Sequence, residues 1–173
     1  MSPVAGDVNR ELPLCALITG WLRSRVDAQA SAEVRVYSDE HGPDAALDRG
    51  RRLRAEIEEA ADPVGVLVVA DGVHTLTRTA PGGHDPKSIP VQTALDDALA
   101  RGDSAALARL PRTVVGRVAY QVLAGLEPAP RTAEELYRGA PYGVGYFAGV
   151  WLPVGRARAR PAGKSESIRV STR

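Results

Sequence analysis

Apolar residues recur at helical spacing along most of the chain. Four segments place them three or four positions apart, which predicts an amphipathic helix in each: residues 12–25, 45–61, 91–99 and 114–123. Gly102 and Gly125 follow the last two segments and are expected to end those helices. Asp44 and Asp103 are candidate N-caps, the second for a short helix that runs through Leu110.

A further short helix and three strands complete the predicted elements. The capping-box pattern of residues 132–135 predicts one or two helical turns. Residues 32–37 alternate apolar with polar side chains, which is typical of a half-exposed strand. Residues 64–70 form a continuous apolar run bounded by turn residues, which predicts a strand buried on both faces. Residues 142–151 have a strand-like pattern, and their three glycines indicate a close approach of another backbone or a ligand.

The order of these elements indicates one layered α/β domain. We assign residues 1–11 to a flexible lead-in and residues 12–152 to the domain. Residues 153–173 are aperiodic and rich in small residues, with six Arg or Lys against one acid, which predicts a disordered basic tail. Three strands are fewer than the usual five or so in a sheet. We therefore expect either that further strands are not recognisable from the sequence pattern or that the chain begins part-way into a larger fold.

Composition narrows the class of protein. A chain of 173 residues with 44% hydrophobic and 25% charged residues suits one ordinary globular domain. The net charge of +1 predicts no general attraction to nucleic acid or to a membrane surface. Cys15 is the single cysteine, so an internal disulfide is excluded, and a cytoplasmic location is expected. No signal peptide or membrane-spanning stretch is recognisable.

The loop after the apolar run is the first candidate for a chemical site. Ligands of α/β sheets usually bind beyond the carboxyl ends of the strands, and residues 71–86 are expected there. His74 could act as a general base near neutral pH, with Asp71 orienting its ring. The alternative is a solvated loop histidine beside a turn aspartate, which is the commoner outcome for a lone histidine.

A metal site is a second interpretation of the same loop. His74, His84 and Asp85, with or without His41, would supply the two imidazoles and one carboxylate that suit Fe(II). Their spacing matches no compact metal motif, and the composition of residues 82–86 is that of an ordinary turn.

Several segments together resemble one enzyme family. The chain is similar, over about residues 12–152, to the class III extradiol ring-cleavage dioxygenases, in the domain of the protocatechuate 4,5-dioxygenase catalytic-subunit type and in its actinobacterial members. Residues 140–147, Ala-Pro-Tyr-Gly-Val-Gly-Tyr-Phe, are the most specific part of the resemblance. The other segments that carry it are residues 70–75, 78–82, 98–107, 120–125 and 136–137.

The resemblance implies a central mixed sheet with helices on both faces, and a non-haem Fe(II) site that cleaves catechol-type aromatics with O2. In such enzymes two His and one Glu bind the metal, and a further His serves as acid/base. His74 falls at the place of that acid/base. Asp71, Gly72 and Tyr142 would then line the site of a small aromatic ligand, His41 would be a metal ligand, and a homo- or hetero-oligomer would be expected.

One departure from the family pattern keeps a second function open. Active members carry a metal-binding His in a His-Pro-Pro-like segment near the N-terminus, whereas the first histidine of this chain is His41. The metal Glu is not assigned either, with Glu127, Glu134 and Glu135 as the late candidates. We therefore expect the chain to begin after that N-terminal element, either as a degenerate member or as a truncated one. The alternative to a dioxygenase is a non-catalytic member that binds a small molecule or another protein.

Overall fold

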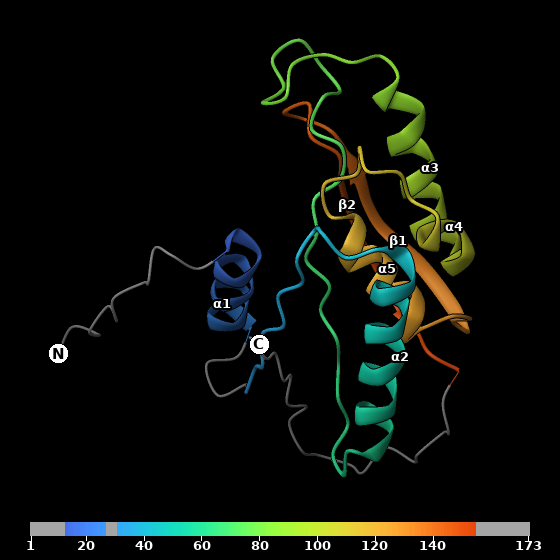
Figure 1. The fold of residues 1–173 in the computed structure, drawn as a ribbon. Coiled ribbons are helices and arrows are strands. Elements are labelled where there is room, and N and C mark those ends of the chain that lie inside the picture. The colour runs from blue at the N-terminus through green and yellow to red at the C-terminus, as the bar shows by residue number, and fades with distance from the viewer. Residues whose placement is uncertain (1–12, 27–30, 155–173) are drawn as a thin grey trace, which may run out of the picture.

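The computed structural model describes residues 13–26 and 31–154 (Figure 1). These residues form five helices and one two-stranded antiparallel sheet: α1 (Leu14–Val26), α2 (Pro43–Glu59), α3 (Ser88–Arg101), α4 (Ser104–Ala108), α5 (Arg117–Leu126), β1 (Thr132–Gly139) and β2 (Tyr146–Leu152). The predicted lead-in, residues 1–11, and the predicted tail beyond Val154 lie outside the described residues.

Helices α2 and α5 form the closest helix pair of the described chain, and Figure 1 shows them side by side. Gly50 and Gly125 face the opposite backbone: a Cβ at Gly50 would collide with the carbonyl oxygen of Val122, and one at Gly125 with that of Leu47. Small residues at the crossing therefore let the two backbones touch. Ala46, which is fully buried, fills the contact beside them.

The second part of the core lies between α3, α4, α5 and the sheet. Its buried members include Leu95, Leu99 and Leu107, and Phe147 and Trp151 of β2 pack against it. The Trp151 indole N–H donates to the Leu99 carbonyl oxygen at 2.7 Å, which ties β2 to the end of α3. The sheet therefore covers the helices with one face of β2.

The connection between α3 and α4 confirms two predictions made from local sequence. Gly102 ends α3 in a left-handed conformation with φ of 68°, which glycine adopts without steric cost. The Asp103 carboxylate accepts the backbone N–H of Ala106 at 2.9 Å and so caps α4. The predicted cap at Asp44 is wrong, because α2 begins earlier, with Gly42 as N-cap and Pro43 as first residue. The predicted helix end at Gly125 is wrong as well, because α5 continues through Leu126 and Gly125 lies inside it, against the backbone of α2.

The prediction of helical turns after Thr132 is wrong, because these residues form β1 instead. β1 pairs with β2 in an antiparallel register in which Thr132 lies opposite Leu152 and Gly139 opposite Tyr146, with an irregularity between Glu135 and Tyr137. A capping box is a local signal, and the cross-strand pairing overrides it. The predicted strand of residues 142–151 is confirmed from Tyr146 onward, since residues 142–145 form the turn that precedes β2.

The two other predicted strands do not form in the described chain. Residues 32–37 and residues 64–70 contain no strand, apart from a single bridge at Gly65. The prediction that residues 64–70 are buried is also wrong, because the side chains of Val66 and Leu67 are 45% and 46% exposed. A strand needs the backbone of a neighbour, and neither segment lies beside one in the sheet that is described.

The mixed content of helix and sheet agrees with the expected class. The sheet of the described residues has two antiparallel strands, and α3 contacts both of them, so a central mixed sheet with helices on both faces is not shown. α1 stands apart from the other helices in Figure 1. Among the described helices, none combines the length and the apolar character that crossing a membrane demands. The cytoplasmic location stays a prediction.

Candidate functional site

The loop that follows the apolar run is fastened to the turn before β2. The Leu76 N–H donates to the Gly143 carbonyl oxygen at 3.0 Å, and the Gly145 N–H donates to the Val73 carbonyl oxygen at 2.9 Å. Gly143 needs its positive φ of 73° and has no room for a side chain, because a Cβ would meet Thr77. Residues 73–76 therefore contact the turn that precedes β2.

A buried amide holds this junction together. Gln92 of α3 is 6% exposed; its side-chain oxygen accepts the Val73 N–H at 2.8 Å, and its amide nitrogen donates to the Asp96 carboxylate at 2.7 Å. A Cβ at either Gly72 or Gly145 would collide with this amide. Gly72 is thus buried at the junction, against the side-chain amide of Gln92.

Gln92 and Asp96 were not singled out from the sequence. Both sit one helical turn apart on the apolar side of α3, and a polar pair at that spacing is the signal that could have found them. Burial raises the pKa of the Asp96 carboxyl, while the hydrogen bond from Gln92 lowers it and the charge of Arg138 lowers it further. The net pKa lies above the ordinary value, so this carboxyl holds its proton more tightly than an exposed one.

His74 lies exposed in the loop, where a ligand could reach its ring. The ring packs so closely against Gly82 that a Cβ atom at Gly82 would collide with it. The Gly82 N–H also donates to the His74 carbonyl oxygen at 3.1 Å. The Asp71 side chain is exposed, and the backbone of Asp71 accepts the Gly116 N–H at 2.8 Å. The described residues therefore tie Asp71 to the amino end of α5, and no hydrogen bond joins it to His74.

The remaining predicted site residues do not converge with His74. Tyr142 is 72% exposed and lines no described cavity. His84 is exposed, and the Asp85 carboxylate accepts the Lys87 N–H at 3.0 Å, as ordinary turn chemistry predicts. His41 is partly exposed, and its carbonyl oxygen accepts both terminal nitrogens of Arg117 at 3.3 Å.

The donor side chains do not fit the implied iron site in the part of the chain that is described. Across residues 13–26 and 31–154, no three His, Cys, Asp or Glu side chains lie close enough together to hold a metal ion. Glu127, one of the late candidates for the metal carboxylate, is 7% exposed and paired with Arg54 at 2.7 Å. We therefore assign no chemical step to iron, and Fe(II) stays a prediction from the resemblance.

The apolar run itself is the most unusual surface near this loop. Val66 and Leu67 are exposed, and the backbone groups of residues 67–69 form no hydrogen bond with another described backbone group. The far end of the run is fixed, because the Tyr120 hydroxyl donates to the Ala70 carbonyl oxygen at 2.9 Å. Burial raises the pKa of Tyr120, and the charges of Asp71 and Asp96 raise it further, so this donor keeps its proton.

Comparison of the chain with known protein families, with curated proteins and with solved structures finds no match.

Proposed function

We propose that this domain is a protein-interaction module, and that residues 64–70 receive an extended strand of a partner protein. One observation carries the proposal: in the described chain, the most apolar run has neither a sheet partner for residues 67–69 nor a cover for Val66 and Leu67. Unpaired backbone groups attract another strand, and exposed apolar patches are typical of interaction sites. Binding by strand addition uses both features at once.

Two features prepare the run for a partner. Tyr120 and the close approach of Gly116 to Asp71 fix its carboxyl end against α5, so part of the ordering is completed before binding. The run carries no charge between Asp62 and Asp71, so a partner strand rich in Val, Ile or Leu meets no charged side chain. With such a strand in place, the larger sheet expected from the sequence would form across the two chains.

Selection from a library of random peptides tests this function. The wild-type chain should enrich peptides with alternating apolar side chains, and the bound peptide should slow hydrogen exchange of the amides of residues 66–69. The double variant Val66→Lys/Leu67→Lys should lose this enrichment by tenfold or more. Ile89→Lys is the matched control, because Ile89 is 49% exposed in the first turn of α3, outside the run.

Two results would overturn the proposal. In the first, the wild-type chain enriches no peptide family above the double variant. In the second, the enriched peptides protect amides elsewhere and leave residues 66–69 unprotected. Both variants change exposed side chains, so circular dichroism should show the same fold in all three proteins before the comparison is made.

The dioxygenase activity implied by the resemblance is a second candidate. Its support is the contact between residues 71–77 and the turn before β2, which brings an exposed His74 to the most specific segment of the resemblance. Anaerobic loading with Fe(II), followed by a catechol and O2, should then give a yellow ring-cleavage product, and His74→Gln should remove it. Absence of both bound iron and product in the full chain would reject this candidate.

A further inference from the structure

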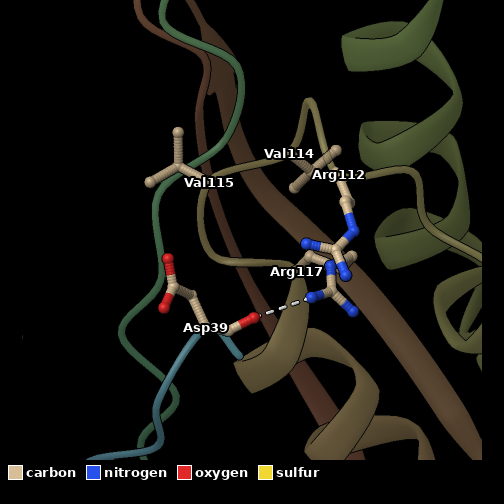
Figure 2. Close-up of a pocket in the computed structure, with 5 residues that line it drawn as sticks. All are labelled: Asp39, Arg112, Val114, Val115 and Arg117. Atoms are coloured by element: carbon tan, nitrogen blue, oxygen red, sulfur yellow. Dashed lines mark hydrogen bonds between the residues drawn. The ribbon is translucent and has the colours of Figure 1, made fainter. Parts of the chain in front are cut away.

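A small pocket lies at the amino end of α5 and borders the start of the histidine loop, since the Val115 N–H donates to the Gly72 carbonyl oxygen at 3.4 Å. Its volume is about 220 Å³, and Figure 2 shows the five side chains that line it: Asp39, Arg112, Val114, Val115 and Arg117. Two of these five are arginines. Neither forms an ion pair with a carboxylate among the described residues, and the single carboxylate of the lining, Asp39, leaves these five residues with a net positive charge.

Arg117 is the unusual member, because it is 6% exposed and yet its hydrogen bonds within the described chain go to neutral groups. Its terminal nitrogens donate to the Asp39 carbonyl oxygen at 2.9 Å, to the Gln121 side-chain oxygen at 3.0 Å and to the His41 carbonyl oxygen at 3.3 Å. These contacts hold the guanidinium in place. They supply no negative charge, and a buried charge without a counter-charge is costly.

Arg112 adds a second guanidinium to the same space. It is exposed, it has no ion pair in the described chain, and Figure 2 shows its guanidinium beside that of Arg117. Two like charges that line one small pocket repel each other, and an anion between them reverses that repulsion. The carboxylate of Asp39 does not serve this purpose, because Figure 2 shows it turned away from both guanidinium groups.

The other walls suit an anionic ligand with a small apolar part. Val114 and Val115 give the pocket apolar side chains. Gly116, the N-cap of α5, provides no side-chain cap, so the positive end of the helix dipole adds to the two arginines. The volume lies below the range of about 300–1,000 Å³ that is usual for drug-sized ligands, which limits the occupant to a small molecule.

We propose that this pocket binds the anionic group of a small metabolite, a carboxylate or a phosphate, between Arg112 and Arg117. Guanidinium groups bind both anions through paired N–H donors, which a lysine cannot reproduce. Arg117 is the preorganised half of the site, because three protein acceptors fix its orientation. Arg112 is the exposed half, and it closes on the ligand. Binding of an anion here does not require a strand bound to residues 64–70.

Calorimetric titration of the full chain tests the proposal at constant ionic strength. Butyrate and inorganic phosphate are the two probes, with chloride as the background anion. We expect saturable binding of at least one probe, and the probe that binds identifies the chemistry of the ligand. Arg112→Gln should weaken this binding tenfold or more, whereas Arg52→Gln should leave it unchanged, because Arg52 is an exposed arginine of α2 that lies outside the pocket.

The choice of variants keeps the test decisive. Arg117 also anchors residues 39–41, so its replacement risks unfolding, and Arg112→Gln avoids that risk. Arg112→Lys keeps the charge and removes the paired donors, so it should recover only part of the affinity. Absence of saturable binding by either probe overturns the proposal. Equal affinities in Arg112→Gln and Arg52→Gln overturn it as well, because binding would then reflect net charge alone.

Discussion

The helix pair α2–α5 and the apolar run of residues 64–70 behave in opposite ways, although only a short turn separates α2 from the run. α2 is rich in charged residues, yet Ala46 and Gly50 are buried where it crosses α5. The run is the most apolar stretch of the chain, yet Val66 and Leu67 are exposed. The presence of a matching surface therefore decides which residues are buried, and hydropathy alone does not.

The physical reason lies in the backbone. A helix satisfies its own N–H and C=O groups, so α2 needs only a groove that accepts Ala46 and Gly50. A strand satisfies its backbone groups through a neighbour, and residues 67–69 have none among the described residues. The same apolar character therefore stabilises the fold in one region and remains available for binding in the other.

The largest difference in the free energy of unfolding is expected when one leucine of the packed core and one leucine of the exposed run are each replaced by alanine. Leu107 is fully buried, so Leu107→Ala should lower the free energy of unfolding by about 3 kcal/mol through lost burial and a cavity. Leu67→Ala should change it by less than about 0.5 kcal/mol, because Leu67 is half exposed. Urea denaturation measures both values. Equal losses of unfolding free energy in the two variants would show that the run is covered in solution, and the two regions would then not differ in packing.

A smaller effect is expected at the crossing of α2 and α5. Gly50→Ala should lower the free energy of unfolding by about 2 kcal/mol, because the added Cβ meets the backbone of α5. Gly20→Ala in α1 is the matched control, since apart from its chain neighbours and the backbone of its own helix nothing lies within 4 Å of its Cβ position. That change should stabilise by up to about 1 kcal/mol through helix propensity alone. Thermal unfolding of the two variants compares them, and a stabilised Gly50→Ala would contradict close backbone contact.

The smallest expected effect is a change in how the free energy of unfolding depends on pH, and it involves Asp96 at the junction between the histidine loop and the turn before β2. Burial raises the pKa of Asp96, so the folded state binds this proton more tightly than the unfolded state. The protonated Asp96 therefore contributes to the free energy of unfolding at low pH, and this contribution is lost as the pH rises above the ordinary pKa of a carboxyl and through the raised pKa of the folded state. Asp96→Asn should remove that loss and be the more stable protein at pH 7, because its side-chain oxygen still accepts from Gln92.

The neighbouring Asp97 provides a control of opposite sign. The hydrogen bond from Arg138 lowers the pKa of Asp97, so its contribution is present near neutral pH and is lost as the pH falls. Urea denaturation across the acid range up to neutral pH should therefore give Asp96→Asn and Asp97→Asn slopes that differ from wild type in opposite directions. Slopes of the same sign would mean that Asp96 is not desolvated at this junction.

Local sequence signals predicted the helical half of this fold well. Spacing of apolar residues located α1, α2 and α3, and Gly102 and Asp103 marked the boundary between α3 and α4. These signals succeed because caps and helical faces depend on residues within one or two turns. The pattern at residues 132–135 failed, because its fate depends on Leu152 and other residues of β2, which lie beyond the reach of a local signal.

The candidate site was predictable only in outline. The sequence indicated that Gly72 and His74 belong to one loop, and the structure places Gly72 at a buried junction and His74 on the surface. Gln92, which fastens the junction, and Arg117, which is buried without a counter-charge in the described chain, were missed. Each is an unremarkable polar residue in a helix until its distant partners are known, and Val73 and Asp39 lie 19 and 78 positions away from them.

By itself the sequence determined where most of the helices form, the boundary between α3 and α4 and which stretch is most apolar, because these properties depend on short-range spacing and backbone preference. Only the tertiary structure decided that β1 is a strand, that Val66 and Leu67 lie exposed and that Arg112 and Arg117 share a pocket. These outcomes depend on contacts between distant segments, in which one surface must supply the hydrogen bonds, volume or charge that another lacks.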